Sequence, residues 1–196
     1  MSFRVVNILD AYDRMEEASL GKMLSTFSCP KNTRIEHFLR DNAVSCARQR
    51  FAITYLAINM TGELAGFFTL THKPVLFDNE RLDGKRKRRV RQFCVRPLDA
   101  HKDENSQLLA SAFLIAQLAK NSIHLNGETI TGSELLKSAF QVLEGIQKSI
   151  GGGLVFLECE DEPKLLDFYE KNGFRKFGER DESDEGEFYH QLLRAF

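Results

Sequence analysis

A long apolar strand, a polar loop, a capped amphipathic helix and a second strand follow one another in this chain, and this order constrains its fold more than any other feature. Residues 113–119 are almost entirely apolar and predict a buried strand, and residues 154–159 predict another. An amphipathic helix is expected over 132–150, after a polar loop over 121–130. A strand, a helix and a strand in succession predict a crossover connection, in which the two strands pair in parallel.

The start of that helix has the sequence signature of a capping box. Thr131 stands at the N-cap and Glu134 follows three residues later, so the Thr131 hydroxyl is expected to accept a hydrogen bond from the Glu134 amide. The amides of Gly132 and Ser133 then point out of the helix start, where the helix dipole favours an anion such as phosphate. Capping boxes also open many helices that bind no ligand, so the pattern alone leaves both interpretations open.

The other segments predict the rest of a mixed sheet. Strands are expected over 3–9, 52–59, 64–71, 108–118, 174–177 and 187–193, and helices over 10–24, 33–48 and 163–172. The strands over 52–59 and 64–71 form an antiparallel hairpin around the turn at 60–63, while 74–104 is expected to be irregular apart from 92–95. We therefore expect one α/β domain over 1–196, with a central mixed β-sheet flanked by helices on both faces.

Composition is that of a soluble globular protein, with 42% hydrophobic and 28% charged residues among 196. The net charge of −1 gives no whole-molecule attraction to nucleic acid or membrane, so any such affinity must be local. The four cysteines form no Cys-x-x-Cys pair and the five histidines have no metal-ligand spacing, so no metal is expected. Free thiols and the lack of a signal or membrane segment predict a cytoplasmic protein with no membrane partner.

Tyr169 is the candidate catalytic residue. It shares a helix face with Leu165 and Leu166, so its ring is expected to lean on the core while its hydroxyl emerges where helix and sheet meet. A phenol in that position can give a proton to a leaving thiolate. The alternative is a packing tyrosine with a solvated hydroxyl, and spacing alone favours it.

These segments together resemble the Gcn5-related N-acetyltransferase superfamily, which transfers acetyl from acetyl-CoA to an amine. The resemblance extends from about Ala52 to the end of the chain and rests on the strand, loop, capped helix and strand, followed by a helix ending Phe-Tyr-x-x-x-Gly-Phe. It implies direct attack of the amine on the thioester, with acetyl-CoA in the splay between the strands that end at Lys120 and start at Leu154. It also implies that Tyr169 is the general acid.

The same resemblance implies which residues hold acetyl-CoA as co-substrate. The family's strand before the loop binds the pantetheine arm and the acetyl carbonyl through backbone groups, and the matching residues are Gln117, Leu118, Ala119 and Lys120. The family's phosphate loop, Gln/Arg-x-x-Gly-x-Gly/Ala, maps to 127–132, which gives Gly127, Thr129, Thr131, Gly132 and Ser133 as cofactor-binding residues. Ile130 stands where the family usually has a glycine, which departs from the loop pattern.

The N-terminal part resembles a narrower branch, which includes acetyltransferase toxins of toxin–antitoxin pairs. The matching stretches are Phe27-Ser28-Cys29, Ile35-Glu36-His37-Phe38-Leu39-Arg40, Thr54-Tyr55-Leu56 and Gly66-Phe67-Phe68-Thr69-Leu70. Members of this branch acetylate the amino group of aminoacyl-tRNA. The resemblance therefore makes charged tRNA a candidate acceptor, and an antitoxin protein and a second copy of the chain candidate partners.

A basic run is the segment that would contact such an acceptor. Lys85 to Arg91 places six cations in seven positions and could hold RNA phosphates, although a solvated loop is the more common meaning of such a run. The acidic stretch over 179–187 could pair with it or form a solvated turn. His72 and Glu158 are candidate bases, and neither is favoured over a structural role. A small amine, a protein amino group, or a non-catalytic module that binds CoA or a partner are the alternative functions.

Overall fold

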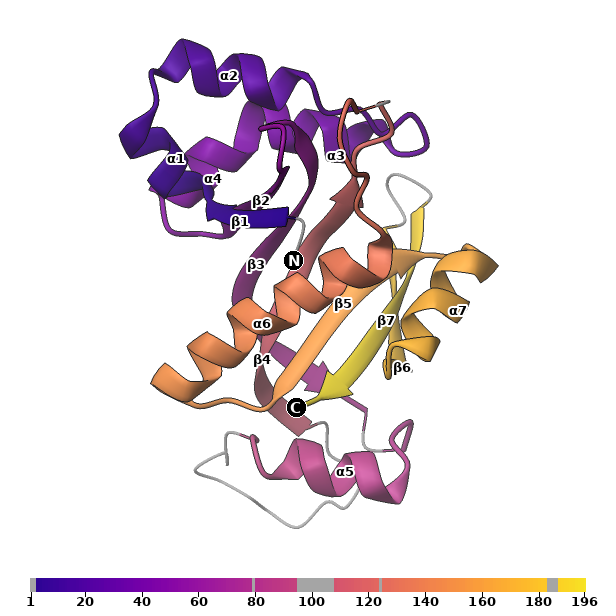
Figure 1. Cartoon of the computed structure of the whole chain (residues 1–196). Helices are drawn as coiled ribbons and strands as arrows, with labels where there is room; N and C mark the ends of the chain where they lie inside the picture. The colour runs from indigo at the N-terminus through magenta and orange to yellow at the C-terminus, as the bar shows by residue number, and fades with distance from the viewer. Residues whose placement is uncertain (1–2, 79, 95–107, 124, 183–186) are drawn as a thin grey trace. The chain divides into compact units, whose positions relative to one another are not determined.

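The computed structural model describes residues 3–78, 80–94, 108–123, 125–182 and 187–196, and Figure 1 shows its elements. The strands are β1 (Phe3–Asn7), β2 (Ile53–Asn59), β3 (Leu64–Phe77), β4 (Leu108–Lys120), β5 (Leu154–Glu160), β6 (Arg175–Glu182) and β7 (Glu187–Ala195). The helices are α1 (Ile8–Arg14), α2 (Glu17–Ser25), α3 (Thr33–His37), the π-helical turn η1 (Phe38–Asn42), α4 (Ala43–Arg48), α5 (Gly84–Arg91), α6 (Gly132–Ile150) and α7 (Pro163–Lys171). The strands form a mixed seven-stranded sheet in the order β1-β2-β3-β4-β5-β7-β6, which confirms the expected fold class.

The chain divides into two compact units, neither of which is continuous in sequence. The first unit comprises Met1–Thr71 and Ile115–Gly145, and the second comprises His72–Leu114 and Ile146–Phe196. The boundaries fall inside β3, β4 and α6, so these three elements contribute residues to both units. A single domain over the whole chain stays a prediction.

The first unit is built on the predicted hairpin. β1 and β3 each pair antiparallel with β2, and the turn between β2 and β3 contains Gly62 in the left-handed region at φ +86°. The predicted helix over 33–48 forms as α3, η1 and α4 without a break in the helical backbone, because the wide π turn is closed by the bond from the Ala43 amide to the Phe38 oxygen. Its inner face buries Leu39 beside the apolar residues of the unit's core, among them Ile8, Leu20, Leu24, Phe27, Leu56, Leu64 and Phe67.

The second unit contains the parallel pair that the crossover predicted. β4 and β5 share the register pairs Phe113–Val155 and Leu114–Phe156, and these are their only pairs although both strands are described over their whole length. β7 pairs antiparallel with β5 on one side and with β6 on the other. The core of this unit consists of buried apolar residues from β3, α5, β4, β5, β6 and β7, among them Phe77, Val90, Ala112, Leu154, Phe156, Phe177 and Leu193.

The expectation that residues 74–104 are irregular is wrong in two places. β3 continues to Phe77, because Val75 and Phe77 are buried on alternate positions and Pro74 is tolerated as an exposed strand residue. The basic run is a helix rather than a loop: Asp83 caps α5 by accepting a hydrogen bond from the Arg86 amide at 2.9 Å. Lysine and arginine favour helices, and Val90 is fully buried in the core, so the run has both a start signal and an anchor. Residues 95–107 lie outside the described residues.

Candidate active site

The capping box at the start of α6 forms as the sequence predicts. The Thr131 hydroxyl accepts from the Glu134 amide at 3.2 Å and donates to the Glu134 carboxylate at 2.7 Å, and the Thr131 amide donates to the same carboxylate at 2.8 Å. These hydrogen bonds from Thr131 hold the pKa of Glu134 below its usual value. Among the residues that the structure describes, the amides of Gly132 and Ser133 have no hydrogen-bond partner, as is usual in the first turn of a helix, so the predicted role of these amides in binding an anion stays a prediction.

The loop before α6 is held by Glu63, which the sequence analysis missed. Its carboxylate accepts hydrogen bonds from the Asn126 amide at 3.2 Å, the Asn126 side chain at 2.9 Å and the Gly127 amide at 3.3 Å. Side-chain bonds from Asn59 and Thr61, followed by those from Asn126, lower the pKa of Glu63 to about 2. The Gly127 amide is thus occupied by Glu63, in contrast to the amides of Gly132 and Ser133.

Glycine at 127 is required by close packing. A Cβ at this position would lie 2.7 Å from the Asn59 side chain and 2.8 Å from the Thr61 hydroxyl, so any larger residue would push the loop off the β2–β3 turn. Ile130, which replaces the family's usual glycine, is buried, and its side chain lies 3.3 Å from a Cβ built on Gly66. It therefore fills the core beneath the loop, while Thr129 next to it is exposed.

The last residues of β4 lead into this loop. Ala119 is buried in the core of the first unit, Gln117 and Leu118 are half-buried, and Lys120 is exposed. A Cβ on Gly66 would lie 2.9 Å from the Ala119 oxygen, so the glycine in β3 permits the close approach of β4.

Asn121 fixes the point where β4 ends. Its side-chain oxygen accepts from the amides of Ser28 at 3.0 Å and Ile123 at 3.1 Å, and its side-chain nitrogen donates to the oxygens of Thr26 at 3.1 Å and Leu64 at 2.9 Å. The side chain is only 7% exposed, and its four polar positions are all satisfied. Asn121 thus ties the segment over 26–28 to β3 and to the start of the loop before α6, and its position directly after the apolar strand is the signal that would have found it.

Hydrogen bonds also join residues of the N-terminal motif that resembles the toxin branch. Glu36 accepts from the Ser28 hydroxyl at 2.9 Å and from the Cys29 amide, and Arg40 donates to the Phe27 oxygen. The bonds from Cys29 and Ser28 lower the pKa of Glu36. Glu36 and Arg40, which are four residues apart, therefore both hold the stretch over 27–29.

Tyr169 lies in the second unit, near the end of α7 (Figure 1). Its residue is 8% exposed, and its ring packs edge-on against Phe168 at 5.0 Å and Phe174 at 5.7 Å between centroids. Burial, with a smaller contribution from Cys159, raises the pKa of Tyr169 well above its usual value. The phenol is therefore protonated at neutral pH, so it can donate a proton but cannot serve as a base.

The two candidate bases have structural partners. The carboxylate of Glu158 pairs with Arg180 at 3.0 Å and accepts from Gln191 at 2.8 Å. His72 lies within β3, which continues past the predicted strand end at residue 71, and a ring nitrogen of His72 is 3.1 Å from the Ser111 hydroxyl. The identity of a general base stays open.

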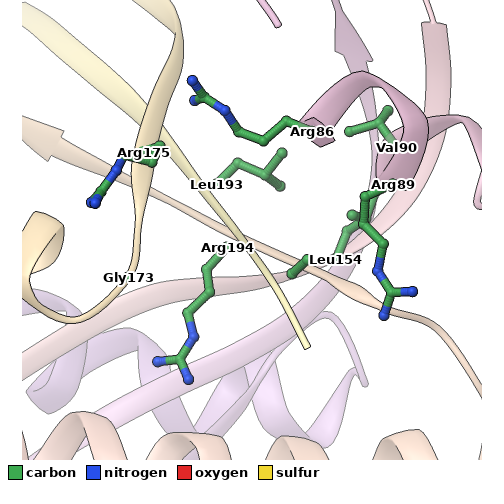
Figure 2. Close-up of a pocket in the computed structure, with 9 residues that line it drawn as sticks. Arg86, Arg89, Val90, Leu154, Gly173, Arg175, Leu193 and Arg194 are labelled. Carbon is green, nitrogen blue, oxygen red and sulfur yellow. The ribbon is translucent and has the colours of Figure 1, made fainter. Parts of the chain in front are cut away.

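The arginines of α5 line a pocket in the second unit together with arginines from elsewhere. Arg86 and Arg89 come from α5, Arg175 from β6 and Arg194 from β7, and the pocket has a volume of about 120 Å³. Figure 2 shows Leu154 and Leu193 between the four arginine side chains. The sequence analysis identified the first pair, which lies in the basic run, and missed the second pair, because neither Arg175 nor Arg194 belongs to a dense run of cations.

The acidic stretch has partners other than the basic helix. Among its described residues, Glu179 pairs with Lys176 and, at 3.9 Å, with Arg81, and these cations lower its pKa. Residues 183–186 of the stretch lie outside the described residues.

Two features are absent from the described residues. No helix in them combines the length and apolar character needed to cross a bilayer. They contain no group of three or more histidine, cysteine or acidic side chains arranged to hold a metal ion.

Comparison with known proteins gives structural relatives only. No family model matches the chain, and no curated protein sequence matches it. A tyrosine-to-phenylalanine mutant of KacT matches with a TM-score of 0.66 at 16% identity, covering 100% of this chain and 95% of that one. AtaT in complex with acetyl-methionyl-tRNAfMet matches with a TM-score of 0.62 at 17% identity, covering 95% and 93%.

A third relative is a tyrosine-to-phenylalanine mutant of the AtaT toxin, bound to the C-terminus of the antitoxin AtaR and to acetyl-CoA. It matches with a TM-score of 0.61 at 17% identity, covering 100% of this chain and 94% of that one. Matches of this extent at such low identity establish that the chain shares the fold of KacT and of the AtaT toxin. The chain therefore has the Gcn5-related N-acetyltransferase fold in the form found in these toxins, as its sequence resemblance led us to expect.

Proposed function

We propose that this protein transfers an acetyl group from acetyl-CoA to an amine by direct attack, and that the amine is the amino group of an aminoacyl-tRNA. The observation that carries the proposal is the start of α6, where a complete capping box leaves the amides of Gly132 and Ser133 without a partner. Two aligned amides at the positive end of a helix dipole suit the pyrophosphate of a nucleotide cofactor.

We expect the remaining contacts with acetyl-CoA at the last residues of β4. The pairing of β4 with β5 includes Leu114 and Phe156 but no later residues, so the backbone of 117–120 is not paired with β5. Backbone groups of Gln117, Leu118, Ala119 and Lys120 would bond the pantetheine arm, and amides near Leu118 and Ala119 would stabilise the oxyanion that forms at the acetyl carbonyl. Thr129, Thr131 and Gly127 would shape the loop around the phosphates.

Tyr169 would protonate the departing thiolate. Its raised pKa means that the phenol carries its proton at neutral pH, and its packing against Phe168 and Phe174 holds the ring in one orientation. Acetyl-CoA supplies the activated acyl group, and positioning of the two substrates would supply most of the rate.

Charged tRNA is supported as acceptor by the exposed cations of α5 and by the fold. Lys85, Arg88 and Arg91 are exposed on this helix, where they can contact phosphates of a polyanion. AtaT, which shares the fold, has a solved structure in complex with acetyl-methionyl-tRNAfMet. An antitoxin protein is proposed as a partner because AtaT binds AtaR. A second copy of the chain stays a candidate partner from the sequence resemblance alone.

The test is transfer of labelled acetyl from acetyl-CoA, with charged tRNA, uncharged tRNA and a panel of small amines and peptides as acceptors. We expect acetylated aminoacyl-tRNA, detected by mass spectrometry, and one free thiol per product, detected by thiol titration. Acetylation of a small amine or a peptide, with charged tRNA unmodified, would contradict the proposed acceptor but leave the transfer intact.

A non-catalytic module that binds CoA is the second candidate. It is favoured by the occupied Gly127 amide and by Ile130, since both remove features of the family's phosphate loop. Stoichiometric acetyl-CoA binding in calorimetry, with no thiol released in the presence of any acceptor, would establish it in place of the enzyme.

A further inference from the structure

A histidine ring in the second unit has a buried nitrogen atom without a partner. The residue is His190 of β7, which is 7% exposed, and its Nε2 atom lies 2.9 Å from the Asp161 carboxylate. Its Nδ1 atom is buried and, among the residues that the structure describes, has no hydrogen-bond partner. Unpartnered buried nitrogens are rare because they destabilise a fold, and a catalytic role is one of the reasons for which they are kept.

The two strands beside β7 place a thiol and a carboxylate next to this ring. β5, β7 and β6 lie side by side in the sheet (Figure 1), and the register partners of His190 are Cys159 of β5 and Glu179 of β6. Paired residues of antiparallel strands project from the same face, with their Cβ atoms about 5 Å apart. Phe188 packs edge-on against the ring at 5.0 Å between centroids and covers it from the same strand.

The two carboxylates that face the ring differ in their surroundings. Asp161 is next to Nε2, and its side chain is 65% exposed, so it connects the ring with solvent. Glu179, which faces the ring from β6, also pairs with Lys176 and, at 3.9 Å, with Arg81. A positive charge on the His190 ring is therefore offset mainly by Asp161.

Cys159 connects His190 with the helix that carries Tyr169, and all three residues belong to the second unit. Cys159 is 6% exposed, and burial, with smaller contributions from Glu160 and Asp161, raises the pKa of its thiol to about 11, so the sulfur keeps its proton at neutral pH. The same residue contributes to the raised pKa of Tyr169, so the sulfur lies within electrostatic range of the phenol. A thiol both donates and accepts a hydrogen bond, so it can join a phenol oxygen to an imidazole nitrogen.

The burial of Tyr169 makes such a connection useful. A phenol whose pKa is raised by burial carries its proton at neutral pH, but it also resists giving that proton to a thiolate, because a buried phenolate would remain. A second proton that reaches the phenol oxygen as the first one departs removes this obstacle. An imidazolium at His190 has such a proton on Nδ1, while its Nε2–H group stays bonded to Asp161.

We propose that His190 is a positioning residue for acetyl transfer, which acts through Cys159 and returns a proton to Tyr169 as this phenol protonates the leaving thiolate. The proposal rests on the proposed function and adds the source of the returning proton. The Tyr169 O–H bond breaks as the CoA S–H bond forms, the Cys159 thiol proton moves to the phenol oxygen, and the Nδ1 proton moves to the Cys159 sulfur. The ring is left neutral and regains a proton from solvent before the next turnover. We call the path from Asp161 through His190 and Cys159 to Tyr169 the relay.

The first test compares kcat of the parent and of His190→Gln across pH, with acetyl-CoA and charged tRNA saturating. Glutamine can donate to Asp161 but cannot carry a second proton, so kcat should fall about tenfold at about pH 5.5 and less than about twofold at about pH 8, since histidine ordinarily loses its charge in this range. Ionisation of the amine is common to both proteins and cancels in the ratio of their rates. His37→Gln, which removes an exposed histidine paired with Asp41 at 3.2 Å, is the matched control. A ratio that does not change with pH would mean that His190 only packs, and would overturn the proposal.

Two further comparisons measure whether His190 acts through its neighbours. Cys159→Ser keeps an O–H group that can pass a proton and should retain kcat within about threefold, whereas Cys159→Ala should lose about as much as His190→Gln. In the Tyr169→Phe background, where no phenol proton has to be replaced, His190→Gln should cause no further loss. Equal rates of the serine and alanine variants, or the full loss from His190→Gln in the phenylalanine background, would overturn the proposal.

Nuclear magnetic resonance of isotope-labelled histidine nitrogens tests the relay in the protein alone, without acetyl transfer. The Nδ1 resonance of His190 should move in Cys159→Ala and, through the sulfur, in Tyr169→Phe, but not in Cys46→Ala, which removes a half-buried thiol of α4. If charged tRNA is acetylated and the resonance moves in none of these variants, the relay is wrong and the enzyme stands. If no acceptor releases thiol from acetyl-CoA but the resonance moves as expected, the relay stands and the proposed function is wrong.

Discussion

Glu134 accepts two hydrogen bonds from Thr131 and returns one through its own amide, so a carboxylate is fixed at the start of α6 beside the amides of Gly132 and Ser133. A fixed negative charge at this place stabilises the helix by opposing its dipole. The same charge repels a second anion there. Helix capping and cofactor binding therefore compete for one positive potential.

Glu134→Gln should consequently bind acetyl-CoA more tightly than the parent. Glutamine keeps the capping-box geometry but carries no charge, so the pyrophosphate loses a repulsive neighbour. We expect a several-fold decrease in Kd by calorimetry at low salt, and a smaller difference at high salt. Glu144→Gln, an exposed change further along the same helix, serves as the control, and weaker binding by Glu134→Gln would place the pyrophosphate elsewhere.

Tyr169→Phe should keep acetyl-CoA affinity and lose about 10²–10⁴ in turnover, the usual contribution of a positioned acid. The ring contacts with Phe168 and Phe174 do not involve the hydroxyl, so the fold should be retained. Turnover is measured by thiol release under saturating substrates, with Tyr12→Phe as the control. Equal turnover of variant and parent would reduce Tyr169 to a packing residue.

Glu63 should make stability depend on pH in the acid range. Its pKa is lowered from 4.5 to about 2 in the folded chain, so the folded state favours the ionised carboxylate. The stabilisation is complete above the unfolded value of 4.5 and disappears as pH falls towards 2. Urea unfolding from pH 7 to pH 3 should therefore show a smaller loss of stability in Glu63→Gln than in the parent, while Glu128→Gln in the same loop should behave like the parent.

Asn121→Leu should destabilise the protein by about 3–5 kcal/mol. The change removes four hydrogen bonds and leaves their main-chain partners at Ser28, Ile123, Thr26 and Leu64 without replacements in a buried place. Urea denaturation measures the difference, with Glu128→Ala, an exposed change in the following loop, as the control. A loss under about 1 kcal/mol would mean that water enters and satisfies these groups.

The elements that sequence reasoning predicted well are those whose signals are local. The capping box needs residues three positions apart, and the helix α6 and the hairpin turn at Gly62 depend on periodicity and backbone preference within one segment. The basic helix was missed because the density of cations suggested a solvated loop, while its cap, Asp83, lies just outside the run.

The residues that hold the candidate site were not predicted, because their partners lie far away in the sequence. Asn121 and its partner Ser28 are 93 positions apart, and Glu63 and its partner Asn126 are 63 apart. No periodicity or local motif connects residues at such separations, since the sheet alone brings them together. Arg175 and Arg194 show the same limit, because neither belongs to a charged run.

The division of the chain inside β3, β4 and α6 has a consequence for how such a protein can diversify. The polypeptide passes between the two units three times, so no single recombination point could exchange one unit for another of different origin. The connection between β3 and β4, which carries α5, is free of that constraint, because its length can change while both strands keep their registers. A change in the length of this connection would therefore leave unaltered the three places where the chain passes between the two units.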